Sequence, residues 1–252
     1  MEAFSSMRTP VFEISPSEIR SSLKKMGHVS NDSLSPDSRT ALYYQDGGQM
    51  LWFGRQGVTD MADTLIQRLY QVNRIGFSDA FFKVKDMESE LQRFKALNFD
   101  KQHTVNDVIA HLEYNLTRAY LTYVAGQKYG FVNPKHAMNR VESKPDSTGK
   151  VKVSYVNLFD SPVERPSHAF YEKAFRKIQN DSVGEMMTEV EPQSALYRQL
   201  LHQLDSASSD QSRKRILVNM ERCRWQGPSP KSTNGKQVVV NVPAFILYAY
   251  GS

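Results

Sequence analysis

The single cysteine of the chain, Cys223, is of a residue type that can act as a catalytic nucleophile. A reactive cysteine needs a lowered thiol pKa and some exposure, and the flanking Arg222 and Arg224 would favour the thiolate. However, these arginines occupy neighbouring azimuths of a predicted helix, and Cys223 falls in the same apolar row as Met220. We therefore predict a packing cysteine rather than a nucleophile. A single cysteine also excludes an internal disulfide.

The other residues able to do chemistry form no catalytic pattern. The six histidines are scattered, and the sequence contains no GxSxG, P-loop, GxGxxG or HExxH string. His111 lies one helical turn after Asp107 and close to Glu113. This spacing matches no metal site, so we predict a structural histidine. The sequence predicts no catalytic residue, no cofactor-binding residue and no metal ligand in this chain.

The elements that hold these residues are predicted to be mostly helical. Glycine is sparse, at 13 of 252 residues, and apolar residues recur at helical spacing in segments with capping signals. The longest segment has a wide apolar face, which predicts a central helix covered on more than one side. The predicted helices cover residues 15–27, 59–76, 84–98, 104–130, 165–180, 191–205 and 213–225. Leu97 is predicted to belong to the apolar stripe of the third of these helices, and Leu196 to that of the sixth.

Strands are predicted to be few and short. Residues 41–44 and 50–53 flank an Asp-Gly-Gly turn, and residues 151–158 alternate as a strand does. Residues 133–150, before the latter strand, are predicted to be a polar connector that ends in a turn. Residues 238–250 form a very apolar β segment interrupted by Pro243, which cannot donate to a ladder. We expect this segment to pair with another copy or to fold back onto a scaffold strand. The predicted fold class is α+β: a mostly helical scaffold with a few short strands and an orphan C-terminal β segment.

Composition limits the class of protein. Hydrophobic residues make up 40% and charged residues 23%, which is typical of a globular chain. The formal charge of +5 tolerates anionic partners, but the densest basic run, residues 212–215, is interpreted as a solvated helix start. No apolar stretch of membrane-spanning length occurs, and the first residues lack an export-signal pattern.

Two stretches carry a family resemblance. "NMERCRW" at residues 219–225, followed by "VVVNVPAFILYAY" at 238–250, resembles the junction of the large scaffold-containing L,D-transpeptidases of Gram-negative bacteria. "LTRAYLTYVAGQKYGFVNP" at residues 116–134 resembles the scaffold region of the same family. The resemblance covers most of the chain.

The resemblance implies covalent acyl transfer by a cysteine–histidine site. A thiolate attacks a tetrapeptide stem of peptidoglycan, and an amine then accepts the acyl group to give a 3–3 crosslink. The family's Ser-x-Gly-Cys-x-Arg string and its upstream histidine belong to the domain that begins at the final β segment, and neither occurs here. Cys223 stands where the family usually has tryptophan. We therefore expect this chain to be inactive alone.

The resemblance also implies an organisation and a location. Residues 1–226 would form the helical scaffold, and residues 227–252 the linker and first strands of a truncated catalytic domain. Partners would be that missing domain and, in the intact parent, peptidoglycan in the periplasm or cell envelope; self-association through residues 238–250 is possible. The candidate interdomain contacts are Asn219, Glu221, Arg222, Arg224 and Trp225.

One departure and two alternatives accompany this expectation. Larger family members insert a peptidoglycan-binding helical module before the junction helix, whereas only residues 205–212 separate the last two predicted helices here. The first alternative is a stand-alone, non-enzymatic envelope interaction module. The second is a basic nucleic-acid-binding protein, ranked last because basic and aromatic residues do not interleave on one stretch.

Overall fold

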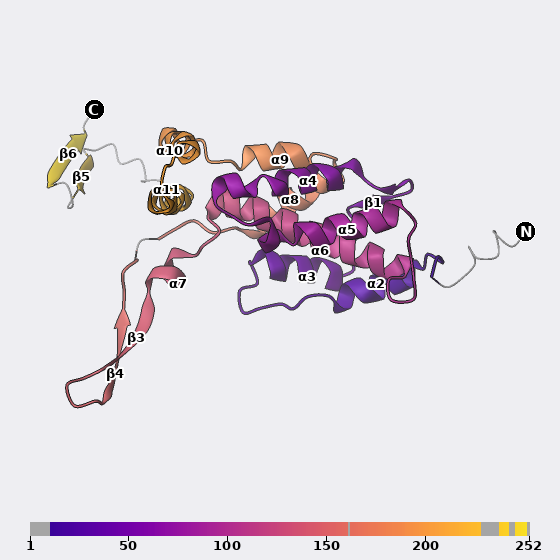
Figure 1. Ribbon diagram of the computed structural model, residues 1–252, viewed down its shortest axis with the longest axis horizontal. Coiled ribbons are helices and arrows are strands. Elements are labelled where there is room, and N and C mark those ends of the chain that lie inside the picture. Colours follow the sequence, from indigo (N-terminus) through magenta and orange to yellow (C-terminus); the bar gives the residue numbers. More distant parts are fainter. Residues whose placement is uncertain (1–10, 161, 228–236, 242–244, 251–252) are drawn as a thin grey trace, which may run out of the picture.

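Helix α6 (Val105–Tyr129) is the centre of the helical body (Figure 1). Of its 25 residues, 18 are buried, so the predicted helix with more than one covered side is confirmed. The computed structural model describes residues 11–160, 162–227, 237–241 and 245–250. The predicted fold class is confirmed, since the described chain is mostly helical with a few short antiparallel strands.

The helices packed around α6 come from both sides of it in the sequence. They share one large core with it and a smaller one near its N-terminal half. Two short 3-10 helices, η2 (Val72–Ile75) and η3 (Asp79–Phe82), connect neighbouring elements. The surrounding helices are α2 (Pro16–Lys25), α3 (Pro36–Gln45), α4 (Asp60–Tyr70), α5 (Val84–Lys95), α8 (His168–Gln179) and α9 (Val183–Glu189). The short helix α7 (Pro134–Met138) follows α6 in the sequence and lies at the base of the β-hairpin that projects from the body (Figure 1).

Helix α3 corrects the prediction of a strand over residues 41–44. Ser35 caps α3 through its side chain, and Pro36 occupies the first helical position. The Tyr44 ring is buried, and its hydroxyl contacts α6. The capping and burial of this segment therefore outweigh the β preference of Leu-Tyr-Tyr.

The second half of the predicted hairpin is also shorter than expected. Within residues 50–53, only Phe53 belongs to a strand, β1 (Phe53–Gly54), which pairs with β2 (Gly57–Val58). Residues 51 and 52 instead give their backbone N–H groups to a buried side chain of α6. The ladder is therefore limited to two residue pairs.

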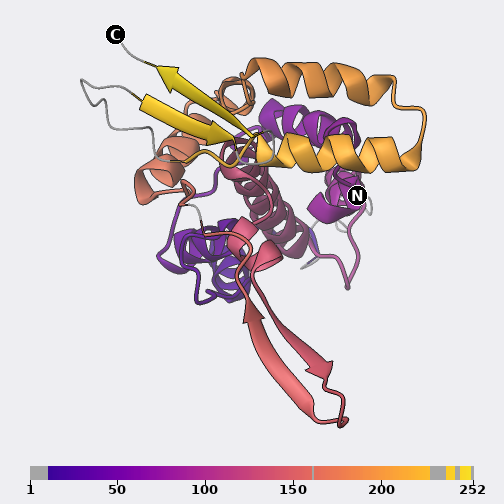
Figure 2. The same cartoon turned by 90° about the vertical axis from the view of Figure 1, so that its left-hand side faces the viewer.

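A β-hairpin projects from the helical body (Figures 1 and 2). Its strands are β3 (Arg140–Pro145) and β4 (Val151–Val156), paired antiparallel over their whole length. The predicted strand at 151–158 is confirmed for β4, whereas β3 falls in a stretch predicted as a polar connector. That prediction was wrong because β3 is stabilised by its partner strand and not by a buried face of its own.

Helices α10 (Ala195–Asp205) and α11 (Asp210–Arg222) pack against each other around a small core of their own. Figure 2 shows them running side by side at one end of the body. Tyr197, rather than Leu196, lies in this core; Leu196 is 57% exposed and was wrongly placed in the apolar stripe. Leu97 was also misplaced, since it follows the end of α5 in a left-handed conformation and is exposed.

The C-terminal β segment forms a hairpin of its own. Strand β5 (Gln237–Asn241) pairs antiparallel with β6 (Ile246–Tyr250). This local pairing differs from the expected pairing with a scaffold strand or another copy, and Phe245 enters β6 with a positive φ of 54°. Residues 228–236 of the predicted linker, and Pro243, lie outside the described residues. Among the described helices, none is long and apolar enough to cross a bilayer.

Candidate functional site: the α11 anchor and an arginine-lined cleft

Arg224, just after α11, is a buried cation held by neighbours from three parts of the chain. It is 1% exposed. Its guanidinium donates to Gln127 Oε1 of α6 at 3.1 Å, to Glu221 Oε2 at 3.1 Å and to the Tyr197 hydroxyl of α10 at 2.8 Å. It also lies 5.4 Å from the ring centroid of Phe131, in cation–π range. We call Gln127, Tyr197, Glu221 and Arg224 the α11 anchor.

Glu221 joins the α11 anchor to the loop after α6. Its second carboxylate oxygen, Oε1, accepts the backbone N–H of Val132 at 2.8 Å. This loop begins at Gly130, whose φ of 98° favours glycine. A Cβ on Gly130 would lie 2.7 Å from Trp225 Cδ1 and 3.0 Å from Glu221 Oε1. The loop after α6 and the end of α11 therefore approach too closely for a larger residue at this position. A buried ion pair with these added hydrogen bonds fixes the position of the end of α11.

The five candidate interdomain residues therefore divide into two groups. Glu221 and Arg224 are buried in the α11 anchor, and Trp225 donates from Nε1 to Val132 O at 3.0 Å. By contrast, Arg222 is exposed, and Asn219 is half-buried with its amide donating to a main-chain carbonyl of its own helix. Within the described chain, the first three bind the scaffold, and the interdomain role of all five stays a prediction.

Cys223 packs at the edge of the α10–α11 core. It is half-buried and contacts the cluster that contains Met220 and Leu200. Burial raises the pKa of the Cys223 thiol, against the smaller lowering effect of Arg224 and Arg222. A thiol with a raised pKa carries little thiolate at neutral pH. Cys223 therefore has the properties of a packing residue rather than of an activated nucleophile.

A second buried polar site occupies the other half of α6. Glu113 accepts the backbone N–H groups of Leu51 and Trp52 and the hydroxyl of Tyr44, and Thr117 receives the indole N–H of Trp52. Burial raises the pKa of Glu113 to about 7, against the lowering effect of these donors. We call this group the Glu113 network. It joins α3 and the segment before β1 to α6.

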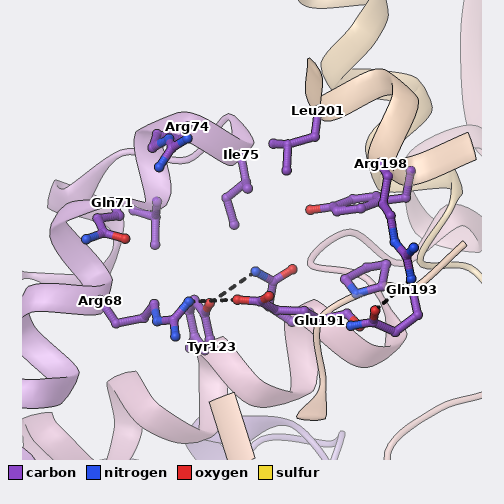
Figure 3. Close-up of a pocket in the computed structure, with 13 residues that line it drawn as sticks. Arg68, Gln71, Arg74, Ile75, Tyr123, Glu191, Gln193, Arg198 and Leu201 are labelled. Atoms are coloured by element: carbon purple, nitrogen blue, oxygen red, sulfur yellow. Dashed lines mark hydrogen bonds and ion pairs between the residues drawn. The ribbon is translucent and has the colours of Figure 1, made fainter. Parts of the chain in front are cut away.

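The cleft next to the α11 anchor has a volume of about 300 Å³. Figure 3 shows Gln71 and Arg74 on one wall, Arg198 and Leu201 on the opposite wall, and Tyr123 at the floor. Gln127 and Tyr197, both members of the α11 anchor, also line it. The anchor and the cleft therefore share side chains.

Sequence reasoning missed the partners of Arg224 and the residues of the cleft. Gln127 and Tyr197 lie in segments predicted as helices, but nothing marked them as polar contacts across the core. The available signal was the spacing of Tyr197 with Leu200 and Leu204, which places the tyrosine on the buried face. His111 was predicted to be structural; it is half-exposed, with Nδ1 3.2 Å from Glu90 Oε1. The described residues contain no group of side chains suited to a metal ion.

Comparison with known proteins gives the class of this chain. A family model described as a Scaffold domain matches residues 37–204, which is about two thirds of the chain and includes all of α6 and all of α10 except its last residue. The chain therefore belongs to the Scaffold domain family. No curated protein and no solved structure matches it.

Proposed function

We propose that this chain is the non-catalytic scaffold portion of a peptidoglycan L,D-transpeptidase and that it supports the catalytic domain. The Scaffold domain match supports a scaffold role. The finer proposal draws on the resemblance of residues 219–225 and 238–250 to the junction in that family. The parent would form 3–3 crosslinks by cysteine acyl transfer in the periplasm or cell envelope.

The α11 anchor is the observation that carries this proposal. Glu221, Arg224 and Trp225 hold the end of α11 against the loop after α6 through charge-assisted and main-chain hydrogen bonds. A supporting domain must hold the segment that leads to its neighbour in a fixed position, and a buried ion pair with several partners does so. Arg222 and Asn219, on the same helix end, remain available to a neighbouring domain.

The apolar hairpin β5–β6 adds support. Val238, Val240 and Leu247 lie on one face of it and are 57%, 61% and 61% exposed. An exposed apolar sheet face gains stability when another layer covers it. A catalytic β domain that continues from this hairpin would supply that layer.

The reading frame and an activity assay test the proposal. We expect the frame to continue into a Ser-x-Gly-Cys-x-Arg string, and the longer protein to form 3–3 crosslinks from tetrapeptide muropeptides, measured by mass spectrometry. Substituting the cysteine of that string by serine should abolish the product. A stop codon directly after Ser252, or no thiol-dependent product from the longer protein, contradicts the proposal.

Arg222→Ala in the longer protein tests the supporting role itself. Because Arg222 is exposed, the substitution should leave the thermal stability of the scaffold unchanged. If Arg222 contacts the catalytic domain, turnover should fall by about tenfold, equivalent to one charge-assisted contact. Arg20→Ala, at an exposed position of α2, is the matched control and should leave turnover unchanged.

A stand-alone envelope interaction module is the second candidate, favoured by the β3–β4 hairpin. Val141, Val151, Val153 and Tyr155 share one face of it and are 63–68% exposed. We test it by co-sedimentation with purified peptidoglycan sacculi. Binding by this chain that is lost when Val153 and Tyr155 are both replaced by threonine supports the module, and no co-sedimentation contradicts it.

A further inference from the structure

The arginine-lined cleft is built from separate elements and has a net positive charge. Arg68 and Arg74 come from α4 and η2, and Arg198 comes from α10. The one carboxylate that lines the cleft, Glu191, pairs with Arg68 at 2.7 Å. Two guanidinium groups therefore face the cleft without a carboxylate of their own.

The two remaining arginines, Arg74 and Arg198, differ from Arg68 in that neither is paired with a carboxylate among the described residues. The Arg198 guanidinium donates to the neutral amide of Gln193 at 3.1 Å, and the Arg74 guanidinium has no hydrogen-bond or ion-pair partner among the described residues (Figure 3). A guanidinium offers five N–H donors in a planar fork that matches a carboxylate. These donors are free to bind an anion.

A second cleft on the same body provides a comparison. It also measures about 300 Å³ and lies at the other side of the C-terminal end of α6. Its arginines, Arg118 and Arg165, are both paired with aspartates, Asp37 and Asp32. The two clefts therefore have about the same volume but differ in charge. The arginines of the second cleft are neutralised by aspartates, whereas Arg74 and Arg198 of the first are not paired with a carboxylate among the described residues.

The rest of the first cleft indicates what kind of anion fits. Ile75 and Leu201 offer apolar surface on opposite walls, and Gln71 and Gln193 offer amide groups that can pair with a peptide backbone. Its volume is at the lower end of the roughly 300–1,000 Å³ typical of small-ligand sites. A short peptide matches this mixture better than a compact inorganic ion, which has no apolar part.

We propose that this cleft binds a short peptide through its free carboxylate. Arg74 and Arg198 hold the carboxylate, the glutamine amides hold the peptide groups, and an aliphatic side chain packs on Ile75 and Leu201. Because Gln127 and Tyr197 belong both to the cleft and to the α11 anchor, a bound peptide also stabilises the end of α11. The proposal does not rest on transpeptidase chemistry.

Isothermal titration calorimetry of the full chain tests the proposal with three probes. These are N-acetyl-alanyl-alanine, the same dipeptide as its C-terminal amide, and inorganic phosphate. The acid should bind about tenfold or more tightly than the amide, since the amide lacks the charge-assisted contacts. Absence of binding, equal affinity for acid and amide, or phosphate binding as tightly as the acid would overturn the proposal.

Substitutions locate the site. Arg74→Ala and Arg198→Ala should each weaken binding of the acid by about tenfold, whereas Arg20→Ala on α2 should not. All three side chains are exposed, so the fold should tolerate the changes. Binding of the acid that is unchanged in both cleft variants overturns the proposal. The acid–amide comparison remains decisive if a variant fails to fold.

Discussion

Glu113 and Glu221 are two buried glutamates that tie other elements to the two halves of α6, and they are held in different ways. Glu113 accepts hydrogen bonds from main-chain N–H groups and tyrosine, and no cation pairs with it among the described residues. Glu221 pairs with the buried guanidinium of Arg224. The first network stabilises the scaffold core, and the second fixes the helix that leads away from it.

The difference lies in what each network loses when one member is removed. Removing one partner of a buried ion pair leaves an uncompensated charge, which costs more than losing one neutral hydrogen bond. The α11 anchor should therefore be the more sensitive of the two to a single substitution, and the Glu113 network the more sensitive to pH.

Arg224→Ala should have the largest effect. It leaves Glu221 buried without its cation, and it leaves Gln127 Oε1 and the Tyr197 hydroxyl without the guanidinium N–H groups that they accept. We expect the free energy of unfolding to fall by about 3–5 kcal/mol, measured by urea denaturation. Amide hydrogen exchange should increase most in α10 and α11. Arg222→Ala is the control and should change stability by less than about 0.5 kcal/mol. An equal effect of both substitutions would contradict the role of the anchor.

Glu113→Gln should show the second-largest effect and a distinctive pH dependence. Because the pKa of Glu113 is raised from 4.5 to about 7, its protonated form is favoured in the fold. The stability that protonated Glu113 contributes is fully present below the pKa of this residue in the unfolded chain. It is lost as the pH rises through the pKa of Glu113 in the folded protein. The free energy of unfolding of the wild type should therefore fall by about 3 kcal/mol between pH 4.5 and about pH 7. That of Glu113→Gln should not show this fall, because glutamine does not titrate.

The measurement for Glu113 is the difference in unfolding free energy between wild type and Glu113→Gln across this pH range. At low pH the variant should be less stable by about 2 kcal/mol, because its amide cannot accept from every donor. This gap should narrow, and can change sign, as the pH rises. A gap that stays constant or widens would show that Glu113 is already ionised in the fold.

The two networks also show what sequence reasoning could and could not find. Local signals predicted the capped start of α2 at Ser15 and the wide apolar face of α6, and both are confirmed. The same Ser-Pro signal begins α3 at residues 35–36, where the β preference of the following Leu-Tyr-Tyr predicts a strand instead. Secondary structure followed from the sequence wherever local cap and periodicity agreed.

The polar contacts did not follow, because their partners are distant in the chain. Tyr44 and Glu113 are 69 residues apart, and Gln127 and Arg224 are 97 residues apart. Residues 219–225 are predicted as contacts to another domain, and that role stays a prediction. The sequence alone does not reveal that Glu221 and Arg224 are buried within this domain. The family resemblance points to residues 219–225, whereas the contacts that Glu221 and Arg224 make are known only from the folded structure.

Gly130→Ala tests how closely the loop after α6 approaches the end of α11 at the α11 anchor. Gly130 has a φ of 98°, and a Cβ there would collide with Trp225 and Glu221. Gly47→Ala is a matched control, with a φ of 84° and no atom within 4 Å of the added Cβ. We expect losses of about 2 kcal/mol for Gly130→Ala and about 1 kcal/mol for Gly47→Ala. Equal losses in thermal denaturation would mean that backbone strain alone accounts for the effect.

Cys223→Ser should have the smallest effect, although Cys223 is the neighbour of Arg224. The thiol is half-buried at the edge of the α10–α11 core, so the change should cost about 0.5 kcal/mol. Because burial raises the pKa of the thiol, wild-type Cys223 should react slowly with iodoacetamide at neutral pH and faster as the pH rises. Rapid labelling at neutral pH would indicate an activated thiolate. With slow labelling and a small stability change, the contribution of residues 219–225 would lie in the ion pair on either side of the cysteine.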